Sequence, residues 1–464
     1  MKRYTEDVVK VVLISTYELG RQPFGLASPA GWLARRGHEV VCMDLSREVL
    51  EESAIREAGL IGFYVPMHTA ARLTMQLMEP VRRMSPEAQL CVFGLYAPMN
   101  EEGFRRAGAD NVLGPEFEES LTRLAALLEE QPAERKIARR AEEARILPRL
   151  KFEAPERSTL PKLKKYAHVV MPDGQHRTTG YTEASRGCKH LCRHCPIVPV
   201  YQGQFRVVDA EVVLEDIRQQ VKAGAGHITF GDPDFFNGVS HGMRIVEKMH
   251  EEFPEITYDA TIKIEHLKKH RKHLERLRET GCVFVTSAVE SLDNAVLEKL
   301  EKGHTRADFL EVLEECRKTG LGLQPTFVAF TPWTTAESYL DLLRMIVELE
   351  LVETVAPIQL GIRLLIPSGS RLLELEEVPE IAEPFDEAAL VYPWKHADAR
   401  LDALAEAVQD AVARAEEQKL SRREIFESIW RLAHETLDAP LASLNVPVLR
   451  DGATIPYLNE PWYC

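Results

Sequence analysis

The stretch SRGCKHLCRHCPIVPVYQGQFRVV, residues 185–208, places three cysteines within eight positions: Cys188, Cys192 and Cys195. Zinc knuckles usually pair Cys-x2-Cys or Cys/His sets to close a tetrahedron, and ferredoxin runs supply four thiolates to a cluster. Three thiolates on one loop can instead bind three irons of a [4Fe–4S] cluster and leave the fourth iron open. Two other interpretations stay open: a Cys3His zinc site completed by His190 or His194, and three unrelated thiols.

The composition indicates an ordinary globular protein of two or three domains, with 464 residues, 45% hydrophobic and 28% charged. The net charge of −15 argues against a nucleic-acid partner. Residues 135–165 are locally basic, which favours a solvated helix and linker over an RNA or acidic-peptide contact. No apolar run reaches the length of a membrane span, and the N-terminus lacks the pattern of a signal peptide. We therefore expect a cytoplasmic protein that does not bind a membrane.

Four further cysteines lie in strand-like runs or on a helical pattern, as small core residues do: Cys42, Cys91, Cys282 and Cys316. In a long chain of this kind, eight cysteines do not indicate a disulfide framework.

Residues 9–129 alternate five strand-like runs, from VVKVVLIS to DNVLG, with helical patterns. This alternation predicts a doubly wound, flavodoxin-like parallel sheet. Ligands of such sheets bind beyond the carboxyl ends of the strands, near the switch point. Those ends are the segments STYELG (15–20), PMH (66–68), GLYAP (94–98) and GPE (114–116).

The βα alternation resumes after the cysteines, with six strand-like runs from GYTEAS to IQLGIRLLIPSG. A partial (βα)6 barrel of parallel strands accounts for them better than a second open sheet. The expected α/β organisation is a doubly wound domain, a charged linker, a partial barrel, and a mostly helical region with an irregular tail: 1–130, 131–175, 176–384 and 385–464.

The motif CKHLCRHC resembles the Cys-x3-Cys-x2-Cys signature of radical S-adenosylmethionine (SAM) enzymes. The preceding SRGC and the later KGHT (302–305) resemble features of the cobalamin-binding branch of that family. Further pieces occur in the family's order over about residues 155–375: TFGDPDF (229–235), SAVES (287–291) and RLLIPSGS (363–370). One departure is His194, where the family often has an aromatic or other residue.

The resemblance implies a [4Fe–4S] cluster on the three cysteines, SAM on its open iron, and an electron donor such as flavodoxin or ferredoxin. It implies SAM contacts from residues at or near the expected strand ends: Gly231, Asp232, Asp234, Glu290, Ser291 and Arg363. The acids could equally be helix caps or solvated loop residues, and Arg363 could form a structural ion pair.

The first domain resembles the cobalamin-binding domain of that branch, because VLGPEFEESL (112–121) matches its last strand and helix start. The resemblance implies cobalamin contacts from the strand-end loops: Ser15, Thr16, Pro66, Gly94, Leu95, Gly114 and Glu116. Residues 1–130 contain no Asp-x-His-x-x-Gly, so a histidine below cobalt is not supported. His68 is the one histidine on a candidate strand-end loop. A domain without cobalamin stays an alternative.

The last residues, LNEPWYC, resemble radical SAM proteins whose tails continue with Cys or selenocysteine and then Ala-Glu-Pro. The resemblance implies a possible selenoprotein read as ending at a UGA codon, with Cys464 as a redox-active thiol near the barrel mouth. A frayed end is the alternative.

Three functions are compatible with these features. The first is a cobalamin-dependent radical SAM methyltransferase acting on an unactivated carbon of a small molecule or peptide. The second is a radical SAM enzyme without cobalamin that performs rearrangement, cross-linking or C–S chemistry. The third is a non-enzymatic iron–sulfur or zinc protein.

Overall fold

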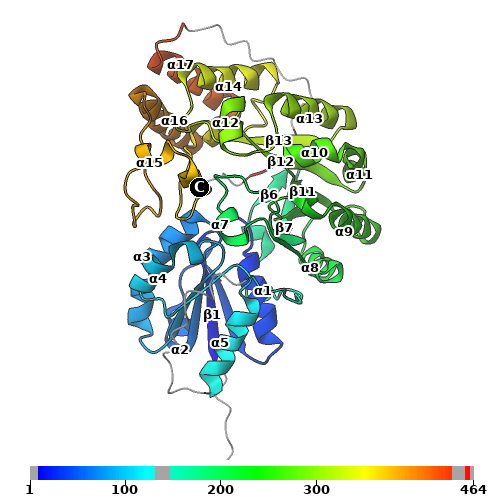
Figure 1. The fold of residues 1–464 in the computed structure, drawn as a ribbon. Helices are drawn as coiled ribbons and strands as arrows, with labels where there is room; N and C mark the ends of the chain where they lie inside the picture. Colours follow the sequence, from blue (N-terminus) through cyan, green and yellow to red (C-terminus); the bar gives the residue numbers. More distant parts are fainter. Residues whose placement is uncertain (1–8, 131–146, 441–454, 460–464) are drawn as a thin grey trace, which may run out of the picture.

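The computed structural model describes residues 9–130, 147–440 and 455–459. The first segment forms an α/β domain, coloured blue to cyan in Figure 1. Its strands are β1 (Lys10–Ser15), β2 (Glu39–Asp44), β3 (Leu60–Tyr64), β4 (Gln89–Phe93) and β5 (Asn111–Leu113). Its helices are α1 (Phe24–Ala34), α2 (Glu52–Glu57), α3 (His68–Met84), α4 (Glu101–Arg106) and α5 (Glu118–Glu130), with the 3-10 turn η1 (Pro98–Asn100).

All five strands are parallel and lie in the order β2-β1-β3-β4-β5, which confirms the predicted flavodoxin-like sheet. Successive side chains of a strand point to opposite faces, so both faces of this sheet are apolar. Val12 and Ile14 pack into one hydrophobic core, and Val11 and Leu13 into the core on the other face. The carboxyl ends of the strands face the second domain (Figure 1).

The second domain is built on a curled sheet of order β13-β12-β11-β10-β7-β6-β14. The strands are β6 (His168–Val170), β7 (His176–Thr182), β10 (His227–Phe230), β11 (Thr257–Thr261), β12 (Cys282–Glu290), β13 (Gly322–Phe327) and β14 (Tyr457–Leu458). Five of them, β7 and β10–β13, are parallel, as predicted for the barrel. Helices α8, α9, α10, α11 and α13 follow one another along one side of the sheet (Figure 1).

The remaining elements of this domain connect the strands or cover the sheet. Near the cysteines they are β8 (Ser185–Gly187), α7 (Val198–Tyr201) and β9 (Phe205–Val207), with η2 (Leu163–Lys165) before β6. Between the strands they are α8 (Ala210–Lys222), η3 (Phe235–Gly238), α9 (Val239–Glu252), α10 (Ile264–Lys269), η4 (Arg271–His273), α11 (Leu274–Glu279), α12 (Asn294–Lys299) and α13 (Arg306–Thr319). After β13 come α14 (Ala336–Glu348), η5 (Pro357–Gly361), η6 (Arg371–Glu374), α15 (Val378–Ile381), α16 (Ala399–Glu417) and α17 (Arg422–Thr436).

The sequence predicted a sixth parallel strand at residues 358–369, and this prediction is wrong, because the structure forms no strand there. This segment begins as η5 and then joins the sheet through a single parallel bridge between Phe330 and Arg363. Prolines explain the interruption, because Pro357 starts the 3-10 turn and Pro367 has no N–H for a ladder. At the opposite edge, β6 and β14 are antiparallel additions that the sequence pattern did not predict.

The region after residue 384 is mostly helical where the structure describes it, through α16 and α17, as predicted, with residues 385–398 irregular and β14 a short strand. Both helices pack into the core of the second domain. None of the helices in the described ranges is long and apolar enough to cross a membrane.

Two arginines, Arg186 buried and Arg157 partly buried, join the two domains. Arg157 donates to Asp216 at 2.7 Å and to the side-chain oxygen of Gln22 at 2.7 Å. Arg186 donates to Glu118 at 2.6 Å and to Glu183 at 2.8 Å. Because Gln22 and Glu118 belong to the first domain, these contacts fix its strand ends against the second domain.

Candidate active site

The three cysteines lie on the loop between β8 and α7, which starts at Gly187, a position that only glycine fits. This glycine has φ +74°, and an added Cβ would lie 2.4 Å from the ring of Tyr201. Cys188 and Cys192 are 8% and 7% exposed, and Cys195 is partly exposed. The loop therefore presents three enclosed thiols in a narrow region, as a cluster that bonds three irons requires.

Burial raises the pKa of the Cys195 thiol to about 12 and also raises that of Cys188. Three thiolates in this environment need positive charge nearby. Lys263 supplies one cation, with Nζ 3.7 Å from the sulfur of Cys192. Lys302 is buried on the same side, where Glu290 and the thiols raise its pKa against the effect of burial. The surroundings thus favour anionic sulfur ligands.

Glu290 ends strand β12 with φ +68°, a left-handed conformation that is uncommon outside glycine. Its carboxylate accepts hydrogen bonds from His194 at 3.0 Å and Lys302 at 3.2 Å. Burial would raise the pKa of Glu290, but Lys302 and His194 hold it below its ordinary value. An anionic acceptor therefore stands beside the cysteine loop, and His194 touches it directly.

Gly231 and Asp232 follow β10, which is separated from β12 by β11 in the sheet. A Cβ at Gly231 would lie 1.8 Å from the hydroxyl oxygen of Tyr181, so only glycine fits. Asp232 accepts hydrogen bonds from the Ser185 hydroxyl at 2.5 Å and the Ala184 amide at 2.9 Å. Burial raises its pKa to about 7. Asp232 thus anchors the start of the cysteine loop.

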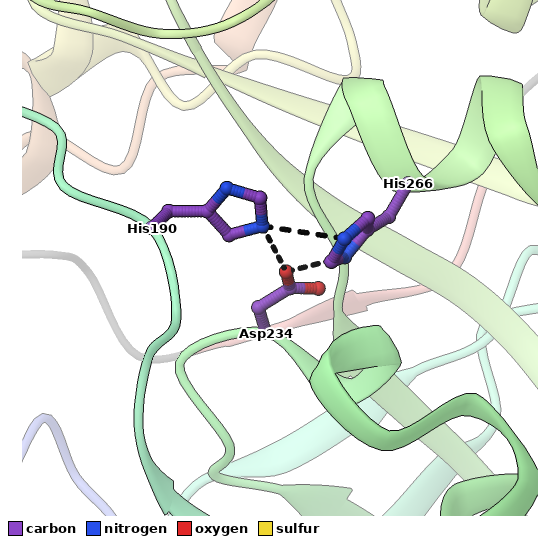
Figure 2. Close-up of side chains that lie close together, drawn as sticks. All are labelled: His190, Asp234 and His266. Atoms are coloured by element: carbon purple, nitrogen blue, oxygen red, sulfur yellow. Dashed lines mark hydrogen bonds and ion pairs between the residues drawn. The ribbon is translucent and has the colours of Figure 1, made fainter. Parts of the chain in front are cut away.

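Asp234 lies on the other side of the same turn and faces two histidines. Its Oδ2 is 2.6 Å from Nδ1 of His266 and 3.5 Å from Nε2 of His190 (Figure 2). Burial alone would raise the pKa of Asp234. The two imidazoles lower it by more, so the pKa lies below its ordinary value. The sequence pattern did not single out His266, since a lone histidine on a helix gives no signal.

The two other SAM candidates lie in different surroundings. Ser291 accepts a hydrogen bond from the amide of Asp293, just before α12. Arg363 donates to Asp402 at 2.5 Å and stacks on the Trp394 ring at 4.1 Å. The arginine is thus engaged in a structural ion pair, the alternative weighed for it, and its contact with SAM stays a prediction.

Several buried polar atoms near the cysteine loop have no hydrogen-bond partner within the described ranges: His194 Nδ1, Ser287 Oγ, Asp234 Oδ2 and both ring nitrogens of His304. Buried polar groups without partners are rare in folded proteins. A polar ligand at the barrel mouth would satisfy them, so these residues fit SAM beside a three-cysteine cluster.

The predicted cobalamin residues meet at the carboxyl edge of the first sheet. Pro66, Gly94 and Leu95 line one cavity of about 200 Å³ with side chains of the second domain. Gly94 has φ +114°, and an added Cβ would lie 3.0 Å from the carbonyl oxygen of Val65. Gly114 joins β5 to this edge.

Glu116 is buried at this edge and accepts a hydrogen bond from Tyr201 of α7 at 2.8 Å. Burial raises the pKa of Glu116 to about 7 despite the nearby Arg186. Ser15 is buried, and its hydroxyl has no partner in the part of the chain that the structure describes. Thr16 instead donates to the Ala70 carbonyl of α3 at 3.1 Å.

A larger cleft of about 740 Å³ lies on the other side of α7. Its lining combines η1 of the first domain with the cysteine loop, α7 and the start of η6, for example Met99, Leu191, Pro199 and Gly369. Pockets for drug-sized ligands occupy about 300–1,000 Å³, and the volume of this cleft lies in that range. His68 does not reach it as a free ligand, since its Nε2 lies 2.5 Å from the carbonyl oxygen of Ala389.

Comparisons with known proteins agree with this geometry. Residues 182–346 match the family model "Radical SAM superfamily". The chain is 24% identical over 325 residues to hopanoid C-3 methylase of Methylococcus capsulatus, covering 67% of this chain and 62% of that protein. It is 27% identical over 157 residues to bacteriochlorophyllide d C-8(2)-methyltransferase of Chlorobaculum tepidum, covering 32% of this chain and 34% of that protein. The chain thus spans less than two thirds of either relative.

Two solved structures share the fold at low identity. The cobalamin-dependent SAM radical enzyme OxsB, with aqua-cobalamin and SAM bound, aligns with a TM-score of 0.70 at 14% identity, over 93% of this chain and 72% of that one. The radical SAM methyltransferase TsrM from Kitasatospora setae, with cobalamin and a [4Fe–4S] cluster bound, aligns with 0.57 at 16% identity, over 74% and 70%. Residues 182–346 are thus similar to the radical SAM superfamily, and the chain shares the fold of these two solved structures.

Proposed function

We propose that this protein is a radical SAM enzyme that uses cobalamin to methylate an unactivated carbon. The observation that carries the proposal is the position of the cysteine loop, which borders the 740 Å³ cleft between the two domains. The loop contributes Leu191 to the lining of the cleft, so a cluster on Cys188, Cys192 and Cys195 would lie close to a cofactor bound there. The methylase and methyltransferase relatives support the same reaction class.

A bound cluster supplies the electron that splits a carbon–sulfur bond of SAM, and a bound cobalamin supplies a carrier for the methyl group. The chain's own residues hold and shield these groups. Lys263 and Lys302 place positive charge beside the thiolates. Glu290 stays anionic and offers an acceptor to donors such as ribose hydroxyls. The loop's burial keeps water from reactive species.

At the domain boundary, the strand-end residues of the first sheet would hold cobalamin. Glu116 and the buried hydroxyl of Ser15 are polar groups with unused hydrogen-bonding capacity there. Pro66, Gly94 and Leu95 would form the apolar wall. The substrate is proposed to be a small molecule or a peptide, and the electron donor a flavodoxin or ferredoxin.

The test is anaerobic reconstitution with iron, sulfide and hydroxocobalamin, followed by desalting and incubation with SAM and a strong reductant. We expect about four irons and about one cobalamin per chain, and formation of both 5′-deoxyadenosine and S-adenosylhomocysteine. Cys195→Ala should abolish both products. Cys316→Ala, which removes a buried thiol of α13 outside the loop, should retain them. Wild-type protein that holds no iron would refute the proposal.

A radical SAM enzyme without cobalamin is the second candidate. The observation in its favour is that the cavity at the strand ends has only about 200 Å³ and is walled by Tyr64, Arg186 and Tyr201. Such an enzyme would retain the irons and form 5′-deoxyadenosine, but it would bind no cobalamin and form no S-adenosylhomocysteine.

Two finer features belong to the proposal as well: a cytoplasmic location and a redox-active tail. Cys464 lies outside the described residues. The codons after position 464 test the tail directly. A UGA codon followed by codons for Ala-Glu-Pro would support a selenoprotein, and any other continuation would contradict it.

A further inference from the structure

Three side chains that could bind a metal meet behind the cysteine loop. His190 lies on the loop between two cysteines, Asp234 on the turn after β10, and His266 on α10 (Figure 2). Nε2 of His190 is 3.2 Å from Nε2 of His266 and 3.5 Å from Oδ2 of Asp234. In the part of the chain that the structure describes, this is the one group of histidines, cysteines and acids whose ligand atoms all lie within 4.8 Å of one another.

Asp234 is oriented toward the two histidines by the backbone. Its Oδ1 accepts hydrogen bonds from the amides of Phe236 at 3.3 Å and Lys263 at 3.4 Å. The other oxygen, Oδ2, therefore points to the imidazoles, as Figure 2 shows. The side chain of Asp234 is fully buried, so water does not compete for this oxygen.

The contact between Asp234 and His266 is close without being a hydrogen bond. Oδ2 and Nδ1 lie 2.6 Å apart. Neither atom has a partner with hydrogen-bond geometry within the described part of the chain, so the two groups meet as a close ion pair. Leaving a buried carboxylate oxygen and a buried imidazole nitrogen without hydrogen bonds lowers the free energy of unfolding, by on the order of 1–3 kcal/mol for each group. A third group that accepts lone pairs from both atoms would remove that cost.

We propose that His190, Asp234 and His266 bind one divalent transition-metal ion of the zinc type, separate from the cluster on the cysteines. Two imidazoles and one carboxylate suit such ions. With bonds of about 2.0–2.1 Å, tetrahedral ligand atoms lie about 3.3 Å apart. The separations of His190 Nε2 from His266 Nε2 and from Asp234 Oδ2, 3.2 and 3.5 Å, match this value. The 2.6 Å contact of Asp234 is with the other nitrogen of the His266 ring, Nδ1, and the ring can offer only one nitrogen to one ion. The His266 ring would therefore adjust on binding, starting from an arrangement in which one ligand atom from each residue lies within 4.8 Å of the others.

Glu265 provides the outer contact that metal-binding histidines usually have. Its carboxylate lies 3.6 Å from Nδ1 of His190. This contact is too long for a hydrogen bond, but the negative charge favours a proton on Nδ1, which would leave Nε2 to bind the metal. Glu265 also lies 3.4 Å from Lys263, which ties it to the same strand-end turn.

The ion would link the cysteine loop to α10 and leave one position for water or another small ligand. Asp234 would then be a ligand of this ion rather than a contact of SAM. The proposal does not depend on the function proposed above, because metal binding is measured directly and without turnover.

The test adds Zn²⁺ to protein whose cluster has been reconstituted anaerobically, removes loosely bound ions by gel filtration, and measures iron and zinc per chain. Wild-type protein should hold about one zinc in addition to its irons. His190→Ala and Asp234→Asn should hold at least tenfold less zinc at the same iron content. His270→Ala is the matched control, since His270 packs against His266 at 5.7 Å between ring centroids but lies outside the site.

X-ray absorption at the zinc edge keeps the proposal testable if a variant does not fold. Zinc in the proposed site has only nitrogen and oxygen neighbours, at about 2.0–2.2 Å. Sulfur neighbours at about 2.3 Å would place the zinc on the cysteines and overturn the proposal. Wild-type protein that retains no zinc beside a full complement of iron would overturn it as well.

Discussion

Replacing Arg186 with methionine should destabilise the protein by about 3–5 kcal/mol, because it removes one partner of a buried ion pair. The guanidinium donates to Glu118 at 2.6 and 3.1 Å and to Glu183 at 2.8 Å. Glu118 is fully buried, so its charge would lack compensation. Methionine fills a similar volume against Phe152, whose ring lies 4.9 Å from the guanidinium carbon, so lost packing contributes little.

The size of this effect should depend on pH. Arg186 lowers the pKa of Glu183, which burial raises, and without the arginine that pKa rises further. An acid with a raised pKa in the folded state stabilises the fold at low pH and loses this contribution as pH rises through the folded pKa. Arg186→Met should therefore cost more near pH 8 than near pH 5.

The assay is equilibrium urea unfolding, fitted with one transition for each domain because a two-domain chain need not unfold in one step. Arg186→Met combined with Glu118→Gln should lose less stability than Arg186→Met alone, since the second change removes the uncompensated charge. Arg56→Ala, which breaks an exposed pair with Glu52, should cost below about 0.5 kcal/mol. A cost of Arg186→Met below about 1 kcal/mol at both pH values would refute the argument.

Three further predictions test individual contacts, the first with a matched control variant. Gly231→Ala should destabilise the protein by about 3 kcal/mol or more, because its Cβ would lie 1.8 Å from Tyr181. Gly226→Ala, at the other end of β10 and 3.6 Å from its nearest neighbour, should be tolerated, and similar urea midpoints for both would contradict this contrast. Lys302→Met should lower the reduction potential of the cluster, since it removes a buried positive charge near the thiols, and an EPR-monitored titration with no downward shift would contradict it. Glu116→Gln should gain stability over wild type as pH rises from about 4.5 through about 7, because burial raises the carboxyl pKa to about 7, and a pH-independent difference in unfolding free energy would refute it.

The first domain was predictable because its sequence signals are local. Val11, Val12, Leu13 and Ile14 form a continuous apolar run, which only a strand buried on both faces accommodates. Each such run alternates with a helical pattern, and right-handed connections then leave few topologies. The cysteine motif is equally local, so its position at a strand end could be expected from the order of residues alone.

The end of the barrel was less predictable because composition does not distinguish a strand from an extended segment. Residues 358–369 are apolar, but their backbone ladder is limited to Phe330, which donates to the Ile362 carbonyl and accepts from the Leu364 amide. The Gln359 side chain also accepts a hydrogen bond from the Phe327 amide of β13. The first part of the segment, η5, packs against α16, where Gln409 donates to the Gly361 carbonyl at 2.6 Å, and Leu364 and Ile366 pack with Trp394. Tertiary packing therefore replaced the sheet ladder.

Side-chain partners were the least predictable feature, and the reason is distance along the chain. His190 and His266 are 76 positions apart, and Arg186 and Glu118 are 68 apart in different domains. A hydrophobic pattern reports which residues are buried, but it contains no information on which buried polar groups face one another. The sequence could therefore indicate that Asp234 lies at a strand end, and only the fold could show that the residue faces two histidines rather than open solvent. The proposed metal site follows from that pairing alone. A motif search would assign His190 to the cysteine motif that surrounds it and would not connect it with His266.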